Sequence, residues 1–149
     1  MSSPVASAGP PTAVPPAKDR RLRRWAIPIL ILLLAEILVG NQLAVVGSPY
    51  PTSYLAAHIA VAALLVVVTG VALAISVRLP SWPARLLATV TFLGALGATA
   101  GGTLFLYAGG AQSDLDIMEG LGVIALLTDI LLIVWGAVTL PSSTARPAR

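Results

Sequence analysis

The sequence contains no cysteine and only one histidine among its 149 residues. The lack of cysteine excludes a disulfide scaffold, a zinc site built from cysteines and thiol catalysis. Charged residues are also scarce, since they make up 10% of the chain, whereas about a quarter of an ordinary soluble protein is charged. Because 57% of the residues are hydrophobic, water cannot solvate most of the surface, and the composition indicates a membrane protein.

Four apolar stretches are long enough to cross a bilayer as helices, which takes roughly 20 residues each. They cover about residues 25–46, 54–77, 86–107 and 117–139. Segments rich in proline, glycine or serine separate them and are typical helix ends. The sequence therefore predicts an all-α integral membrane four-helix bundle with up-down-up-down topology, formed by residues 25–141. We expect residues 1–24 to be a flexible cytoplasmic tail with a basic anchor, and residues 142–149 a short cytoplasmic tail.

The nine basic residues fall in three places: before the first span, between the second and third spans, and after the fourth. They are Lys18, Arg20, Arg21, Arg23, Arg24, Arg78, Arg85, Arg146 and Arg149. If both termini are cytoplasmic, all nine lie inside, as the positive-inside rule requires. The net charge of +3 then divides into +8 inside, −3 near the outer surface and −2 within the membrane.

This distribution of charge is a topology signal for a multi-pass protein of the cell membrane and gives no indication of a nucleic-acid partner. The predicted partners are the lipid bilayer, including its anionic headgroups, together with either further copies of the chain or another membrane protein. A shift of 61 residues also aligns VRLPS at 77–81 with VTLPS at 138–142. This match indicates either two repeated helix pairs or a chance resemblance between apolar segments.

Two carboxylates fall inside the predicted spans, where a charge is costly. Glu36 lies halfway along the first span and Asp129 halfway along the fourth, so we expect them to share a depth in the bundle. They could form a proton relay or a cation site, or each could be protonated and hydrogen-bonded to a neighbouring helix. Asn41 and Gln42 lie one turn outward from Glu36 and could line a polar pocket.

His58 is the single histidine and lies near the start of the second span, at the depth of Met118 and Glu119 in the fourth. Imidazole and thioether groups are both axial ligands of heme iron, so His58 with Met118 is a candidate heme b site. His58 could instead pair with Glu119, or have no special role. The sequence predicts no other metal site.

Glycines mark one face of the third span, at Gly94, Gly97 and Gly101. The spacing from Gly97 to Gly101 is a GxxxG pattern, which lets another helix backbone approach closely. Packing within the chain is the favoured use, with homodimerisation as the alternative.

The run LLLAEILVGNQLAVVG, followed by a histidine early in the next span, resembles one four-helix half of heme A synthase. It is also similar to small prokaryotic four-helix membrane proteins, themselves uncharacterised, that look like such a half. In the heme-binding relatives, the second and fourth helices each supply a histidine to heme. His58 matches the second-helix position, but Met118 or Glu119 occupies the fourth, so the resemblance implies His/Met ligation only and no heme A synthesis.

Three functions are consistent with these residues. The favoured one is a small, non-enzymatic membrane protein with a structural or accessory role, because the sequence has no catalytic constellation. The first alternative is a heme-binding or quinone-associated redox protein that uses His58 with Met118. The second alternative is a small proton-coupled carrier that uses Glu36 and Asp129.

Overall fold

The structure is a computed structural model that describes residues 17–46, 50–107 and 112–138. Within these ranges the chain forms four long helices and contains no strand. The helices are α1 (Ala17–Val46), α2 (Thr52–Ser76), α3 (Trp82–Tyr107) and α4 (Gln112–Val138). Each is long and apolar enough to cross a membrane, and the predicted all-α four-helix bundle is confirmed. The predicted tails at 1–16 and 142–149 lie outside the described residues.

The helices begin earlier than the apolar stretches alone indicate. α1 starts at Ala17, so residues 17–24, which we assigned to the tail, are helical. Lysine and arginine are good helix formers, which explains why the helix extends through the basic cluster. α4 starts at Gln112, whose Nε2 donates to Asp116 Oδ1 at 3.0 Å, and the acidic Asp114 stabilises the first turn through the helix dipole.

Prolines help to set the helix ends. Pro51 is the N-cap residue of α2, and its carbonyl accepts a hydrogen bond from the Leu55 N–H at 3.1 Å. The turn between α2 and α3 is closed by a hydrogen bond from the Leu79 N–H to the Ser76 carbonyl at 2.9 Å. Pro83 follows in the first turn of α3, where its missing N–H costs no helical hydrogen bond. Pro28, by contrast, lies inside α1, which continues through it.

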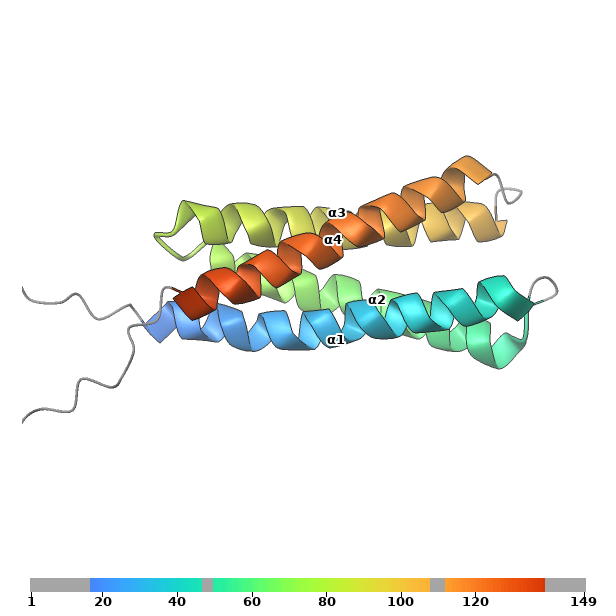
Figure 1. The fold of residues 1–149 in the computed structure, drawn as a ribbon, viewed down its shortest axis with the longest axis horizontal. Coiled ribbons are helices and arrows are strands. Elements are labelled where there is room, and N and C mark those ends of the chain that lie inside the picture. The colour runs from blue at the N-terminus through green and yellow to red at the C-terminus, as the bar shows by residue number, and fades with distance from the viewer. Residues whose placement is uncertain (1–16, 47–49, 108–111, 139–149) are drawn as a thin grey trace, which may run out of the picture.

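The four helices pack as a ring in the order α1, α2, α3, α4 (Figure 1). Each helix packs against its two neighbours, whereas within the described chain the backbones of the diagonal pairs, α1 with α3 and α2 with α4, do not approach each other closely. The contact between α3 and α4 is the most extensive. Chain direction alternates from helix to helix, so the start of α1 and the end of α4 lie at the same end of the bundle (Figure 1).

We name the two ends of the bundle after the charged residues near them. The basic end holds the start of α1 and the α2–α3 turn, with Arg24, Arg78 and Arg85. The acidic end holds the start of α4, with Asp114, Asp116 and Glu119.

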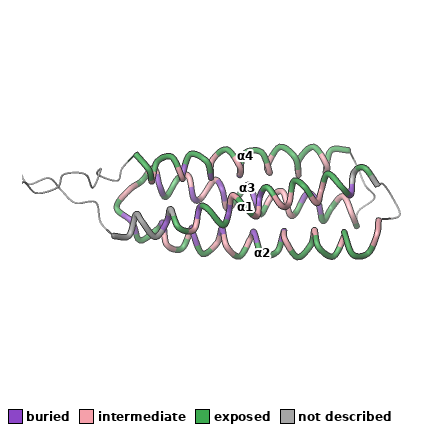
Figure 2. The backbone as a smooth tube through the Cα atoms, turned by 60° about the horizontal axis from the view of Figure 1, so that its bottom comes forward, coloured by how far each residue is buried: buried purple, intermediate pink, exposed green. Residues whose placement is uncertain are grey.

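The hydrophobic core extends from the basic end to the middle of the bundle, where most buried positions lie (Figure 2). Small alanine side chains and larger leucines alternate in it, which lets the helices approach one another closely. Its twelve members are Leu22, Ala26, Ile29, Leu33, Leu65, Ala72, Leu79, Ala84, Ala88, Ala95, Ala125 and Leu132.

Candidate functional site

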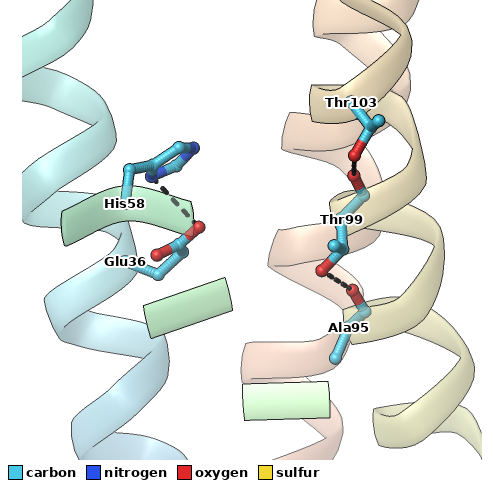
Figure 3. Close-up of polar contacts among 5 residues, drawn as sticks. All are labelled: Glu36, His58, Ala95, Thr99 and Thr103. Atoms are coloured by element: carbon cyan, nitrogen blue, oxygen red, sulfur yellow. Dashed lines mark hydrogen bonds and ion pairs between the residues drawn. The ribbon is translucent and has the colours of Figure 1, made fainter. Parts of the chain in front are cut away.

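The most distinctive polar contact inside the bundle joins Glu36 of α1 to His58 of α2 (Figure 3). His58 Nδ1 lies 3.1 Å from Glu36 Oε1. Both side chains are largely buried, with 14% of His58 and 20% of Glu36 exposed. The two atoms are within ion-pair distance, but the direction of the ring N–H does not fit a hydrogen bond. The contact therefore brings an acid and a base together inside the span.

Gly40 lies one turn along α1 from Glu36 and faces the same imidazole. A Cβ atom built on Gly40 would lie 3.6 Å from His58 Cε1, which is an ordinary van der Waals distance. The imidazole is thus placed over the backbone of α1 and beside the carboxylate. Two buried polar atoms of this group, Glu36 Oε2 and His58 Nδ1, have no hydrogen-bond partner among the described residues.

Sequence reasoning had paired His58 with Met118 or Glu119, but in the structure its close polar contact is Glu36. Glu119 is exposed on α4, and the backbones of α2 and α4 do not approach each other closely in the described part of the chain. Met118 is partly buried at the α3–α4 interface, where its Sδ would lie 3.0 Å from a Cβ atom on Gly102. Its thioether therefore fills the space that a side chain at position 102 would take.

Asn41 and Gln42 are both exposed on the last turns of α1, at the acidic end. The structure gives neither side chain a contact with the Glu36–His58 pair. Figure 3 also shows Thr99 and Thr103 of α3, which lie apart from the Glu36–His58 pair. Their hydroxyls donate to carbonyls of their own helix, Ala95 O at 2.9 Å and Thr99 O at 2.8 Å. Such bonds satisfy threonine inside a membrane without a partner helix.

Asp129 is fully buried in α4, and neither of its carboxylate oxygens has a hydrogen-bond partner among the described residues. The preceding residue, Thr128, accepts or donates a hydrogen bond with Thr91 of α3 at 2.9 Å. Next to Thr91, Phe92 packs over Gly70 of α2. Asp129 therefore lies at the level of this part of α2, in the core.

This register separates the two intramembrane carboxylates. Gly70 follows His58 by twelve residues in α2, which at 1.5 Å per residue is about 18 Å along the bundle. Glu36 contacts His58, whereas Asp129 lies near the level of Gly70. The structure thus does not bring Glu36 and Asp129 together.

The glycines of α3 lie against α4. A Cβ atom on Gly94 would lie 2.9 Å from the Leu121 carbonyl oxygen and 3.0 Å from Ala125 Cβ. One on Gly101 would lie 3.1 Å from the Asp114 carbonyl oxygen, and one on Gly97 would overlap the Leu121 side chain. Gly94 and Gly101 leave room for the α4 backbone and Gly97 leaves room for the Leu121 side chain, so packing within the chain accounts for all three.

Two polar pairs were not predicted from the sequence, namely Glu36 with His58 and Thr91 with Thr128. Both pairs join consecutive helices. Thr91 and Thr128 are equally far from the centre of the α3–α4 connection, so pairing positions by their distance from the loop would have found them. Glu36 lies farther than His58 from the α1–α2 connection, and the same rule does not find that pair.

Chemically, the Glu36–His58 pair could exchange a proton, or Glu36 could orient an imidazole that binds a ligand through Nε2. No group of three or more histidine, aspartate or glutamate side chains that could hold a metal ion occurs among the residues that the structure describes. No protein-family model matches the sequence, and no solved structure matches the chain.

Proposed function

We propose that the protein is a small, non-enzymatic membrane protein with a structural or accessory role, in which the intramembrane polar residues hold the helices together. The observation that carries this proposal is the contact between Glu36 and His58. A carboxylate alone in hydrocarbon is costly, and an imidazole from the neighbouring helix offsets that cost while it fixes α1 against α2. The pair lies outside the hydrophobic core, where few other side chains are buried.

The same proposal includes an orientation and a location. Arg24, Arg78 and Arg85 share the basic end, and the positive-inside rule puts such an end in the cytoplasm. Both ends of the described helical bundle, Ala17 and Val138, lie there as well (Figure 1). We place the protein in a prokaryotic cell membrane with its N- and C-termini cytoplasmic.

A double-mutant cycle tests whether the pair is structural. Glu36→Ala and His58→Ala are made singly and together, and the free energy of unfolding is measured by SDS titration in mixed micelles. We expect a coupling energy of about 1 kcal/mol, in the range of polar pairs between membrane helices. The control cycle combines His58→Ala with Glu119→Ala, whose side chain is exposed, and should show no coupling. Coupling to Glu119 but not to Glu36 would contradict the proposal.

A b-type heme bound through His58 is a second candidate function, because one observation favours it. Histidines that bind metals commonly have a carboxylate at the other ring nitrogen, and Glu36 occupies that place beside Nδ1. Met118 fits less well as the second ligand, since its sulfur lies over Gly102 and would have to leave the α3–α4 interface. An absorption spectrum after heme-supplemented expression decides between the two functions. A Soret band that His58→Ala removes would favour the redox protein.

A further inference from the structure

The α2–α3 turn at the basic end combines exposed arginines with an exposed aromatic ring. Arg78 lies in the turn, and Trp82 and Arg85 lie in the first turn of α3. We infer that this surface, formed by Arg78, Trp82 and Arg85, binds the headgroup of an anionic phospholipid. The inference rests on the membrane placement proposed above, and it adds the class of lipid and the residues that recognise it.

The core holds this surface in place. Leu79 and Ala84 are each 3% exposed and pack in the same cluster as Leu22 and Ala26 of α1. Arg78 and Arg85 are their chain neighbours and are exposed, so the buried residues hold the backbone from which both arginines project. Hydrogen bonds from the Arg78 N–H to Ile75 O at 3.2 Å and from the Arg85 N–H to Ser81 O at 3.3 Å fix the turn further.

Among the side chains that the structure describes, no acidic group balances the positive charge of this surface. Of the acidic side chains that the structure describes, Asp114, Asp116 and Glu119 lie at the acidic end. Glu36 contacts His58, and Asp129 is buried in the core. Within the described ranges, neither Arg78 nor Arg85 forms an ion pair. A phosphate group on a neighbouring lipid is therefore the natural counter-charge at this level of the membrane.

An exposed apolar face of α3 extends from the arginines toward the middle of the bundle, and it favours a lipid over a free anion as the ligand. Trp82, Leu86 and Leu93 follow one another at steps of four and seven residues, so they share one face of α3. All three are exposed, at 66%, 50% and 56%. The order along this face is a cationic group and an indole, then an apolar stripe. A phospholipid presents the complementary order of phosphate, glycerol backbone and acyl chain.

Quenching by brominated lipids tests the inference in the full chain. Trp25→Phe and Trp135→Phe leave Trp82 as the single tryptophan, which is excited selectively in nanodiscs that contain either brominated phosphatidylglycerol or brominated phosphatidylcholine. With a gain of about fivefold for each of the two arginines near anionic lipid, we expect the surface around Trp82 to bind phosphatidylglycerol roughly 25-fold better than phosphatidylcholine. Arg78→Gln with Arg85→Gln should remove this preference, and Arg78→Lys with Arg85→Lys should retain most of it.

Controls separate the failure of this inference from the failure of the membrane placement. If both lipids quench Trp82 equally while Arg78 and Arg85 are unchanged, the lipid inference is wrong but the membrane placement stands. If neither lipid quenches Trp82, the membrane placement itself is contradicted. Glycerol 3-phosphate at millimolar concentration should not compete, and competition would show a site for free anions instead. If the glutamine variant loses helicity by circular dichroism, salt is varied in its place. The lipid preference should fall as salt screens the arginines, and a preference that salt leaves unchanged overturns the inference.

Discussion

The two hairpins of the bundle are held together by different means. In the α3–α4 hairpin, glycines let the two backbones approach, and Gly94 lies so close to α4 that a Cβ atom would meet the Leu121 carbonyl at 2.9 Å. In the α1–α2 hairpin, Glu36 and His58 make a polar contact, and a Cβ atom on Gly40 would find an ordinary distance of 3.6 Å. Close backbone approach at glycine distinguishes the first interface, and a largely buried acid–base contact distinguishes the second.

The two intramembrane carboxylates also differ in their surroundings. Glu36 lies beside a basic group of the neighbouring helix, whereas Asp129 is fully buried among core residues and its oxygens have no hydrogen-bond partner in the described chain. Under the proposed function we expect Glu36 to contribute to helix association, and we expect the buried, unpartnered carboxylate of Asp129 to lower the stability of the bundle. A carboxylate inside a membrane span can therefore raise or lower the free energy of unfolding, depending on the side chains that surround it.

The largest expected effect comes from filling the α3–α4 interface. Gly94→Ala places a Cβ atom against the backbone of Leu121 and against Ala125 Cβ, so the helices must move apart. We expect the free energy of unfolding, measured by SDS titration, to fall by about 2 kcal/mol. Gly120→Ala is the matched control on α4, because a Cβ atom there meets nothing within 4 Å. Equal losses from both variants would show that the glycine contacts do not determine this interface.

A smaller effect, which raises the free energy of unfolding, is expected from a substitution at Asp129. Asp129→Val replaces a buried polar group that lacks a partner with an apolar side chain of similar size. We expect the free energy of unfolding to rise by about 1 kcal/mol in the same titration. Glu36→Val should instead lower it, since His58 would lose its acidic neighbour. A loss of stability in Asp129→Val would mean that the carboxylate has a stabilising partner.

The smallest effect is expected at Gly40. Gly40→Ala adds a Cβ atom at van der Waals distance from His58, and alanine favours the helix over glycine. The gain from helix propensity should leave the free energy of unfolding unchanged or raise it by about 0.5 kcal/mol. A loss as large as that of Gly94→Ala would erase the distinction between the two hairpins.

Length and apolar composition were sufficient to predict the four helices and their order. They were insufficient for the rotation of each helix about its axis, because spans that are apolar on every side do not indicate which face lies inward. This is why the sequence offered Met118 and Glu119 as candidate partners of His58, or no partner, whereas the structure places His58 beside Glu36. Two cues in the chain were informative. Glycines at Gly94 and Gly97 marked the close face of α3, and the α3–α4 connection brings together Thr91 and Thr128, which are equally far from it.

Asp129 shows a second limit of sequence reasoning. Its position halfway along a predicted span suggested that it shared a depth with Glu36, but the helices differ in length beyond the apolar stretches. α1 extends to Ala17 and α4 starts at Gln112, so the middle of a span is not the middle of the bundle. The register that separates the carboxylates depends on contacts such as Phe92 over Gly70, which composition does not show.

The short turn between α2 and α3 also limits how copies of the chain can assemble. Helix α2 ends at Ser76 and α3 begins at Trp82, so the connection is far too short to cross a bilayer and neither hairpin can invert alone. In the orientation proposed above, the bundle would enter the membrane as a whole, and every copy would share that orientation. A homo-oligomer of such copies would be parallel, with its rotation axis along the membrane normal.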